Sequence, residues 1–300
     1  MNYDIVNFIE EWGEGVKLLT RKRILASATA VVLLAGTVLA FRGNFALEQN
    51  LYVVSSDELP SGFDGFRIAH ISDLHNTQMA THNERLLEML RSAKPDVIAI
   101  TGDLVDSRKT NLAVALHFVS EAVKIAPCYY VTGNHETRID EYEQLKARII
   151  RVGAVVLEDT KVKIWRKGET ITLAGLNDPG MYKENLYVEN KDVVDRKLST
   201  LCANDDGYTV LLSHRPEMFE TYARYDLNLV LCGHAHGGQI RLPQIGGLFA
   251  PGQGFLPAYD AGEFSRADTT MIISRGIGNS IFPIRINNPP ELVIVQLQGL

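Results

Sequence analysis

The sequence predicts an α/β fold in which two β-sheets pack together and helices cover their outer faces. In the first half of the chain, short apolar runs typical of buried strands alternate with amphipathic helical patterns, as in β-α-β units. The second half is richer in strand-like runs than in helical ones. The composition, 46% hydrophobic and 22% charged over 300 residues, is enough for one large domain or two small ones with a sizeable core.

An uncharged segment near the N-terminus, residues 24–41, is expected to be a membrane anchor. It consists mostly of Leu, Val and Ala, and about 18 residues is near the shortest length that spans a bilayer as a helix. A basic cluster at residues 21–23 precedes it, and acidic residues follow it. The positive-inside rule therefore places residues 1–23 in the cytoplasm and the remainder of this single-pass membrane protein outside it.

Two alternatives to an uncleaved anchor remain open at this point. Residues 38–40, Val-Leu-Ala, resemble the small-residue cleavage site of a signal peptide. A buried helix of a soluble domain is the other alternative, although the absence of any charge in the segment disfavours it. We favour the anchor because a long segment precedes the basic cluster.

Residues 42–65 are interpreted as a tether followed by the first strand of the domain, and residues 66–300 as the main domain. Apolar side chains at helical spacing predict helices at residues 82–92, 111–125, 140–151, 191–201 and 217–223. Apolar and β-branched runs predict strands at residues 51–54, 68–72, 97–101, 128–131, 155–157, 162–165, 171–174, 208–213, 227–232, 240–242, 271–274 and 292–297.

Five of the predicted strands end in residues that can bind metal or move a proton. These residues are Asp73, His75, Asp103, Asp106, Asn134, His135, His214, His234 and His236. In open α/β sheets, ligands bind at the edge where the strands have their carboxyl ends. We therefore expect these side chains to lie close together.

Seven of these residues have the chemistry of a two-metal site: Asp73, His75, Asp103, Asn134, His214, His234 and His236. Imidazole suits zinc, iron and manganese, and a carboxylate can bridge two ions. Two divalent ions about 3.5–4 Å apart lower the pKa of a shared water and stabilise the attacking and leaving oxygens of a phosphoryl displacement. Any one of these residues could instead be structural, but all seven at strand ends favour metal binding.

The net charge and the cysteine content argue against a nucleic-acid-binding protein, a disulfide-stabilised fold and a thiolate zinc site. The net charge of -6 argues against a dedicated nucleic-acid binder, which would carry a basic surface. The three cysteines, Cys128, Cys202 and Cys232, lack the spacing of a disulfide framework or a thiolate zinc site. Without a thiolate ligand, manganese or iron is as plausible as zinc.

Five motifs, in order, resemble those of the calcineurin-like metallophosphoesterase superfamily. They are Asp-x-His at residues 73–75, Gly-Asp-x-x-Asp at 102–106, Gly-Asn-His-Glu at 133–136, the strand-end His214, and Gly-His-x-His at 233–236. The resemblance covers about residues 66–297. The anchor and the segments 212–217 and 237–239 are similar to the membrane-associated bacterial phosphodiesterase branch. The resemblance implies a four-layer α-β-β-α sandwich.

The resemblance also implies a role for each motif residue. Asp73, His75, Asp103 and His236 would hold the first metal, and Asp103 would bridge to the second, completed by Asn134, His214 and His234. A metal-bridging hydroxide would attack phosphorus, with His135 as the general acid. Asp106 would hydrogen-bond His135 and raise its basicity, unless it is only a turn or cap residue. Glu136 is expected to hold neighbouring backbone.

One departure from the family bears on the substrate. The protein serine/threonine phosphatases have an Arg directly after Gly-Asp-x-x-Asp, whereas this chain has Ser107 there and Arg108 one residue later. A phosphodiester carries less charge than a monoester, so we expect a phosphodiesterase. Hydrolysis of the pyrophosphate in a nucleotide-lipid such as UDP-2,3-diacylglucosamine is an alternative, since a lipid-linked substrate would suit a tethered enzyme. A non-catalytic scaffold on the same fold is another.

Three further features have open interpretations. The apolar loop at residues 243–262 could be a lid or a groove for a lipid tail, but a surface loop with its apolar residues turned inward is favoured. Arg275 and Arg285 could reach a phosphate or a neighbouring carboxylate, and we interpret both as structural.

Overall fold

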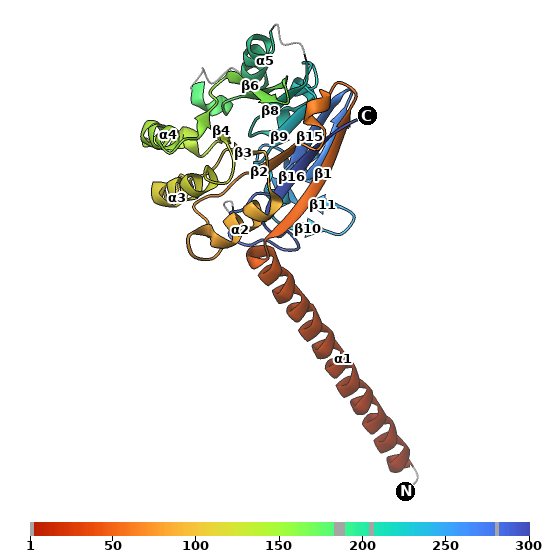
Figure 1. Cartoon of the computed structure of the whole chain (residues 1–300). Helices are drawn as coiled ribbons and strands as arrows, with labels where there is room; N and C mark the ends of the chain where they lie inside the picture. The colour runs from red at the N-terminus through yellow and green to blue at the C-terminus, as the bar shows by residue number, and fades with distance from the viewer. Residues whose placement is uncertain (1–2, 183–189, 204–206, 280–281) are drawn as a thin grey trace.

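The computed structural model describes residues 3–182, 190–203, 207–279 and 282–300, and within them two six-stranded sheets pack face to face (Figure 1). The first sheet contains, in spatial order, β1 (Glu48–Ser56), β16 (Glu291–Gly299), β2 (Arg67–Ile71), β3 (Val97–Thr101), β4 (Cys128–Val131) and β5 (Val155–Val156). The second contains β14 (Gly262–Arg266), β15 (Thr269–Ile273), β9 (Leu229–Cys232), β8 (Thr209–Leu212), β7 (Glu169–Gly175) and β6 (Thr160–Arg166).

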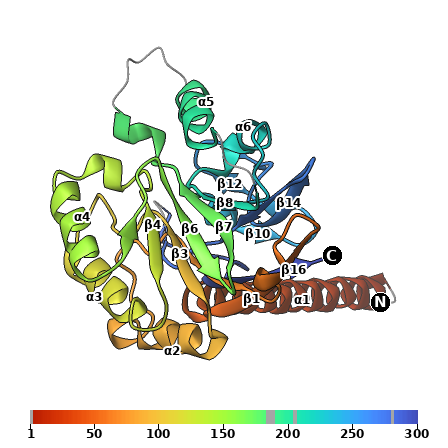
Figure 2. The ribbon, with the colours of Figure 1, turned by 45° about the horizontal axis from the view of Figure 1, so that its top comes forward.

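Helices cover the outer face of each sheet (Figure 2). The first sheet is covered by α2 (Glu84–Ala93), α3 (Leu112–Ala122) and α4 (Tyr142–Arg151), and the second by α5 (Asn190–Leu201) and α6 (Phe219–Tyr222). Three apolar layers result. The middle layer, between the sheets, contains Phe63, Leu173 and Val295, all buried. The predicted four-layer α-β-β-α sandwich is therefore confirmed.

Short elements complete the chain. They are the 3₁₀ turns η1 (Ser61–Phe63), η2 (Thr81–Asn83), η3 (Glu136–Arg138), η4 (Pro179–Tyr182), η5 (Pro216–Met218) and η6 (His236–Gly238), and the strand pairs β10 (Arg241–Leu242) with β11 (Gly246–Gly247) and β12 (Phe249–Ala250) with β13 (Gly254–Phe255).

The central strands run parallel, which brings their carboxyl ends to common edges. In the first sheet β2 pairs with β3 and β3 with β4, and in the second β7, β8, β9 and β15 pair in the same manner. Every residue of β3, β8 and β9 is buried. Continuous apolar runs are typical of strands buried on both faces, which is why the sequence pattern located these strands.

Edge strands and loops are where the prediction was incomplete. The strand β14 was not predicted, because its alternating exposed residues include Glu263, Ser265 and Arg266. The helix predicted from residue 82 begins at Glu84, since His82 has a left-handed φ of 58° that a helix does not accommodate. The other predicted helices and strands are present with boundaries shifted by a few residues.

The first strand of the domain, expected at residues 51–54, is β1. β1 pairs in parallel with β16, the last strand of the chain, along all nine of its residues, and Val54 is buried between the sheets. The N-terminal helix α1 (Tyr3–Phe45) ends close to this strand, so residues 46 and 47 alone connect the two. The folded unit thus includes β1.

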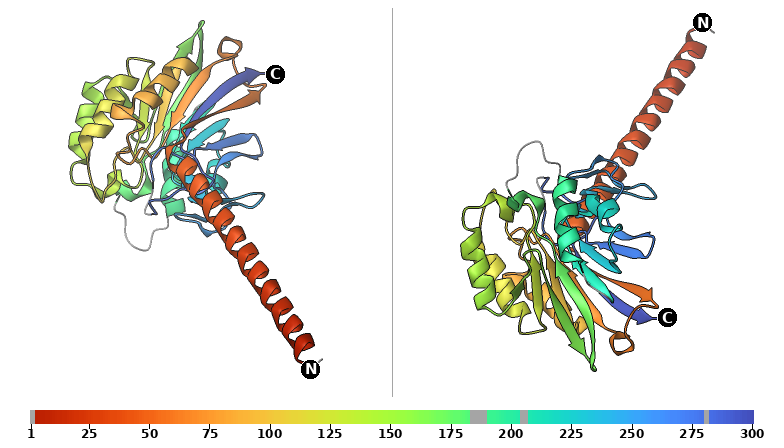
Figure 3. Two further views of the ribbon diagram at one scale, coloured as in Figure 1. Left: turned by 90° about the horizontal axis from the view of Figure 1, so that it is seen from below. Right: turned by 90° about the horizontal axis from the view of Figure 1, so that it is seen from above.

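The helix α1 projects away from the domain, and Figure 3 shows this from below and from above. Its segment Lys22–Phe45 is long and apolar enough to cross a membrane, by length and composition, and none of the most apolar 18-residue stretch within it is buried in the described structure. The predicted anchor at residues 24–41 lies inside this segment.

The loop at residues 243–262 leaves several of its large apolar residues exposed, contrary to the favoured interpretation. Phe255 is 83% exposed, and Ile245 and Leu256 are each 63% exposed. The reason is local. The two strand pairs β10–β11 and β12–β13 turn tightly at glycines with positive φ, Gly246 and Gly254, and such narrow hairpins enclose no interior in which to bury large side chains.

A truncation series tests whether β1 is part of the folding unit. A chain that begins at Ala46 is expected to keep the fold, whereas one that begins at Phe66 loses the β1–β16 pairing and the burial of Val54, and should unfold at a temperature lower by more than about 10 °C. Scanning calorimetry measures the difference. Equal unfolding temperatures for the two chains would contradict the placement of β1 in the domain.

Candidate metal centre

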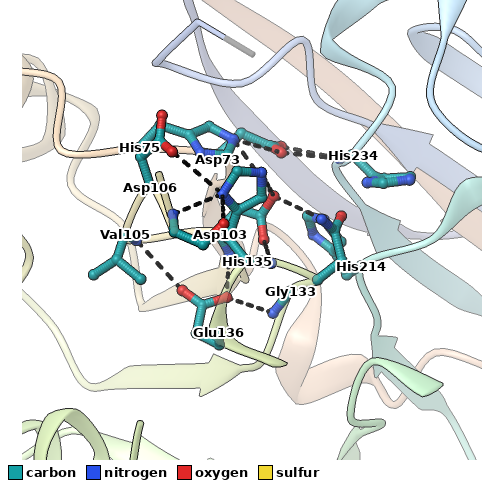
Figure 4. A network of polar contacts seen from close by, with 12 residues as sticks. Asp73, His75, Asp103, Val105, Asp106, Gly133, His135, Glu136, His214 and His234 are labelled. Carbon is teal, nitrogen blue, oxygen red and sulfur yellow. Dashed lines mark hydrogen bonds and ion pairs between the residues drawn. The ribbon is translucent and has the colours of Figure 1, made fainter. Parts of the chain in front are cut away.

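The residues predicted to bind metal converge at the carboxyl edge of both sheets (Figure 4). The loops that carry them follow β2 (Asp73, His75), β3 (Asp103), β4 (Asn134), β8 (His214) and β9 (His234, His236). All seven residues are buried. Residues as far apart in the chain as His75 and His236, which are separated by 161 positions, thus meet because parallel strands end side by side.

The backbone of this edge adopts strained conformations that direct the side chains toward one another. Positive φ values between 44° and 66° occur at Asp73, His75, Asp103, His234 and His236. Each such conformation costs about 1–3 kcal/mol outside glycine and persists where surrounding structure enforces it. The enforcement is visible in two bonds between neighbouring loops: the N–H of Asp73 donates to the Gly102 carbonyl at 3.1 Å, and that of His75 to the Asp103 carbonyl at 2.9 Å.

Two glycines allow the loops to approach the carboxylates. A Cβ atom on Gly133 would lie 2.2 Å from Oδ1 of Asp103. A Cβ atom on Gly233 would lie 1.8 Å from Oγ of Ser72 and 2.3 Å from Oδ2 of Asp73. Any larger residue at either position would have to displace a carboxylate.

Asp73, His75 and His236 form the first of three groups of potential ligands among the described residues. Nε2 of His236 lies 3.3 Å from Oδ1 of Asp73, and Nε2 of His75 lies 3.7 Å from the same oxygen. The two Nε2 atoms face each other at 3.3 Å. The backbone N–H of His234 donates to Oδ2 of Asp73 at 3.0 Å, which orients that carboxylate.

Asp103 belongs to both of the other groups, one with His75 and His135 and one with His214 and His234. Its Oδ2 is 3.4 Å from Nε2 of His75 and 3.3 Å from Nε2 of His214. Its Oδ1 accepts a hydrogen bond from the backbone N–H of His135 at 2.8 Å. Nδ1 of His214 is bonded to the Thr101 carbonyl at 2.7 Å, so Nε2 of that ring is the nitrogen left to face Asp103.

Unpaired polar atoms test whether metal ions fit here. Among the described residues, Oδ1 of Asn134 and Nε2 of both His214 and His234 are buried without a hydrogen-bond partner. Buried polar atoms are normally satisfied, so three orphaned electron-pair donors at one edge of the domain call for a cation. An amide oxygen, two imidazole nitrogens and carboxylates suit zinc, iron or manganese. The residues present therefore fit divalent metal binding.

Charged groups in the cluster shift one another's pKa values. Burial alone would raise the pKa of Asp103, but His214 and His75 outweigh it and hold that pKa well below its usual range. Burial alone would lower the pKa of His214, but Asp103 outweighs it and raises that pKa to about 10. Positive charge is thus favoured beside Asp103. Divalent cations supply such charge, and their binding releases protons from the imidazoles.

Glu136 holds the backbone of two motifs, as the sequence predicts. Its Oε2 accepts hydrogen bonds from the N–H groups of Asp103 at 2.9 Å and Gly133 at 2.8 Å, and its Oε1 accepts one from Leu104 at 2.8 Å. Burial and the nearby Asp103 raise the pKa of Glu136 to about 7, while these backbone donors favour its ionised form. The residue keeps the second and third motifs in register (Figure 4).

His135 does not hydrogen-bond Asp106, contrary to the expectation from the motif. Oδ1 of Asp106 lies 3.6 Å from Nδ1 of His135, and the backbone N–H of Ser107 donates to Nδ1 at 2.9 Å instead. Asp106 binds the Arg108 guanidinium, with Oδ2 accepting at 2.7 Å. Burial lowers the pKa of His135 to about 4, so the ring is neutral. Because Nδ1 accepts, its proton is on Nε2.

Comparison with known proteins identifies the family. A profile of the calcineurin-like phosphoesterases matches residues 66–238, more than half of the chain. The protein belongs to this family. The calcineurin-like phosphoesterases are metal-dependent phosphoester hydrolases that use two metal ions, and the clusters described above provide ligands for metal in this member.

Individual relatives resemble this phosphoesterase over most of its length. A metallophosphoesterase of Bacillus subtilis strain 168, named YkuE and described as uncharacterized, is 29% identical over 260 residues, covering 84% of this chain and 86% of the relative. A transmembrane protein with metallophosphoesterase domain from Bos taurus is 28% identical over 302 residues, covering 96% of this chain and 66% of the relative. The crystal structure of TT1561 of Thermus thermophilus aligns with a TM-score of 0.49 and 15% identity, covering 71% of this chain and 90% of that one.

A cavity of about 160 Å³ opens over the ligand clusters of this phosphoesterase. Residues that sequence reasoning left without a role line it, namely Arg138, Arg215, Pro251 and Gly252. The Arg215 guanidinium is held by the buried Asp178, with its Nε donating to Oδ2 at 2.6 Å and Nη2 to Oδ1 at 3.2 Å. The Arg-Pro-Glu sequence directly after His214 was the available signal. The role of Arg215 depends on its pairing with Asp178, which follows a different strand, β7, so this sequence alone did not reveal it.

The two arginines near the C-terminus are structural, as interpreted from the sequence. Arg275 Nε donates to Glu291 Oε2 at 3.1 Å and its Nη2 to Glu48 Oε2 at 3.1 Å. Arg285 is fully buried and donates to the carbonyls of Arg275 and Gly278. Neither lines the cavity of the phosphoesterase.

Replacing Gly233 tests the close approach to Asp73. In Gly233→Ala the new methyl group would push the Asp73 carboxylate from its position, so metal affinity is expected to fall by about 10-fold or more. Metal titration followed by elemental analysis measures this. Gly299→Ala is the matched control, because a Cβ there meets nothing within 4 Å. Normal metal affinity in Gly233→Ala would contradict the proposed crowding.

Proposed function

We propose that this protein is a membrane-anchored phosphodiesterase that uses two divalent metal ions. The observation that supports it is the pair of ligand groups that meet at Asp103, with orphaned donor atoms beneath a small cavity. In this proposal Asp73, His75, Asp103 and His236 hold one ion, and Asp103, Asn134, His214 and His234 hold the other. Manganese, iron and zinc all suit these donors.

The chemistry of the ions is general to such sites. When bound, they lower the pKa of a water and stabilise charge on the attacking and leaving oxygens of the phosphoryl group. The protein's own groups do the rest. The carboxylates and imidazoles fix the ions in a buried pocket, and Glu136 keeps the loops of Asp103 and Gly133 in place.

His135 is the candidate for protonating the leaving group. Its Nδ1 is fixed by the Ser107 N–H, which leaves Nε2–H directed toward Asp103 at 4.0 Å and into the cavity. A donor at this place stabilises negative charge on the departing oxygen by hydrogen bonding and proton transfer. Asp106 lies 3.6 Å from Nδ1, near enough to attract an imidazolium without bonding the neutral ring.

The scarcity of free cationic groups supports a diester over a monoester. Arg108, one residue beyond the position of the phosphatase arginine, is bound to Asp106 through Nε and Nη2. Arg215 borders the cavity but is paired with Asp178 and Glu217. Arg138 is the remaining arginine that lines the described cavity. A diester carries one negative charge fewer than a fully ionised monoester, so this lining suits it better.

The membrane anchor is supported by α1 and by a relative. The apolar segment Lys22–Phe45 meets the length and composition of a membrane span. The similar Bos taurus protein is named as transmembrane. In this proposal α1 is an uncleaved single span, and the positive-inside rule places the phosphoesterase domain outside the cytoplasm.

A substrate panel tests the proposed reaction. Protein loaded with manganese is expected to hydrolyse bis-p-nitrophenyl phosphate with a kcat/KM about tenfold above that for p-nitrophenyl phosphate, because Arg138 alone among the arginines that line the described cavity is left to balance the extra charge of the monoester. A nucleotide-lipid pyrophosphate completes the panel. Preference for the monoester would reject the diesterase assignment, and preference for the pyrophosphate would favour the nucleotide-lipid alternative.

Substitutions separate metal binding from proton transfer. Asp103→Asn and His234→Gln are expected to lose bound metal and turnover together, since each removes a ligand. His135→Gln should lower kcat about 10²–10⁴-fold while retaining its metal, since its ring bonds backbone and is not needed to hold the ions. Elemental analysis and steady-state kinetics on the same samples distinguish loss of metal from loss of turnover. An equal loss of metal in His135→Gln would contradict its role.

A further inference from the structure

The domain carries an exposed apolar surface beside the end of α1. We call it the apolar face and define it by the two strand pairs β10–β11 and β12–β13, with Ile245, Phe249, Phe255 and Leu256 exposed. The stretch from residue 242 to residue 258 contains no charged side chain. Contiguous exposed apolar surface without charge marks an interaction site in a folded protein.

Hydrogen bonds connect the apolar face to α1. Nδ2 of Asn44, in the last turn of α1, donates to the Arg285 carbonyl at 3.1 Å. The next residue along, Ile286, accepts from the N–H of Arg241 in β10 at 3.0 Å. Figure 1 shows β10 and β11 beside the point where α1 meets the domain. The apolar face is therefore continuous with the exit of the proposed membrane span.

The connection leaves the domain little freedom to turn. Only residues 46 and 47 separate α1 from β1, a reach of about 7 Å when extended. Oδ1 of Asn44 also accepts a hydrogen bond from Nδ2 of Asn279 at 3.1 Å. A domain held in this way must present the surface around the helix exit to the membrane.

The same surface borders the metal centre. Pro251 and Gly252, between β12 and β13, line the cavity together with Asp103 and His234. On the other side of the site, the N–H of Gly278 donates to the Asp73 carbonyl at 2.6 Å, one residue before the Asn279 that bonds α1. The metal centre thus contacts both the loop that joins β12 to β13 and the segment that bonds the end of α1.

We propose that the apolar face inserts into the bilayer that α1 crosses, and that the substrate is a phosphodiester in the headgroup of a membrane lipid. The proposal rests on the proposed function and names its substrate class. Large apolar side chains at a membrane surface enter the boundary between headgroups and acyl chains, about 5–10 Å deep. A lipid phosphate at that level reaches the cavity while its acyl chains remain in the bilayer.

The reaction at this surface is an ordinary hydrolysis. The oxygen of a water forms a bond to phosphorus, and one ester P–O bond breaks. The departing alcohol oxygen takes one proton, the product phosphate keeps the new oxygen, and the second water proton passes to the phosphate or to solvent. No oxidant or second substrate is needed.

Fluorescence quenching in proteoliposomes tests the insertion directly. The full chain carrying Phe255→Trp, with Trp12→Phe and Trp165→Phe, has a single tryptophan on the apolar face. Phospholipids brominated on their acyl chains are expected to reduce its emission about twofold or more, because the residue lies within the interfacial region. The matched control retains Trp165 as its single tryptophan, which is 73% exposed on β6 at the end away from the metal edge, and should not be quenched.

Two activity measurements separate this inference from the proposed function. Phe255→Ser with Leu256→Ser should lower turnover of a phosphatidyl diester in vesicles about tenfold, because burial of one large apolar side chain changes partitioning by that order. Turnover of soluble bis-p-nitrophenyl phosphate should stay within about twofold, since neither side chain lines the cavity.

Each outcome has a distinct meaning. A protein inert toward both diesters fails the proposed function. A protein that hydrolyses the soluble diester but shows no quenching at residue 255 overturns the membrane contact alone. Concentration-dependent cross-linking through residue 255 in detergent, without quenching in vesicles, would assign the apolar face to contact with a second copy of the chain. That result would also overturn the proposed membrane contact.

Discussion

One buried carboxylate, Asp103, joins the two sheets at the functional edge. Its Oδ2 faces His75 from the first sheet and His214 from the second, while Oδ1 accepts the His135 N–H. A carboxylate removed from water is costly unless positive charge and hydrogen bonds compensate it. Every neighbouring loop supplies part of that compensation, so the position of each loop is tied to the same oxygen atoms. The folding of the edge and its affinity for cations have a common cause.

Backbone strain and crowding at this edge are consistent with loops that are held in place around the buried Asp103 carboxylate. Left-handed φ values at Asp73 and His234 are unfavourable alone, and Gly233 has no space for even a methyl group. Cations that bind the folded site but not the unfolded chain add stability in proportion to their affinity. The protein can therefore tolerate a strained edge when metal is bound. Glu136 contributes without metal, since one carboxylate organises backbone donors from two motifs.

The sequence predicted the layers and the ligand clusters because both depend on local pattern. Buried parallel strands read as apolar runs, and polar residues directly after them can only gather at one edge. It did not predict the Arg215–Asp178 pair or the Ser107 contact to His135, since these depend on distances between loops. Motif resemblance suggested an Asp106–His135 bond, but a shift of the arginine to residue 108 gives Asp106 a different partner. The prediction of an inward-facing loop at residues 243–262 was wrong for Phe255 and Leu256, because hydrophobicity alone does not distinguish a buried core from an exposed apolar surface.

The short link between α1 and β1 restricts how the domain is oriented relative to α1. A flexible tether of about twenty residues would let a domain tumble and meet soluble substrates from any side. A two-residue link, with Asn44 bonded to Arg285 and Asn279, instead holds the metal edge toward the end of α1. The β1–β16 pairing carries this restraint into the centre of the first sheet, because β16 also pairs with β2, whose end bears Asp73. The helix α1, the first sheet and the residues proposed to bind metal are thus mechanically continuous, and in the proposed orientation the domain is placed to meet a substrate that lies at the membrane surface.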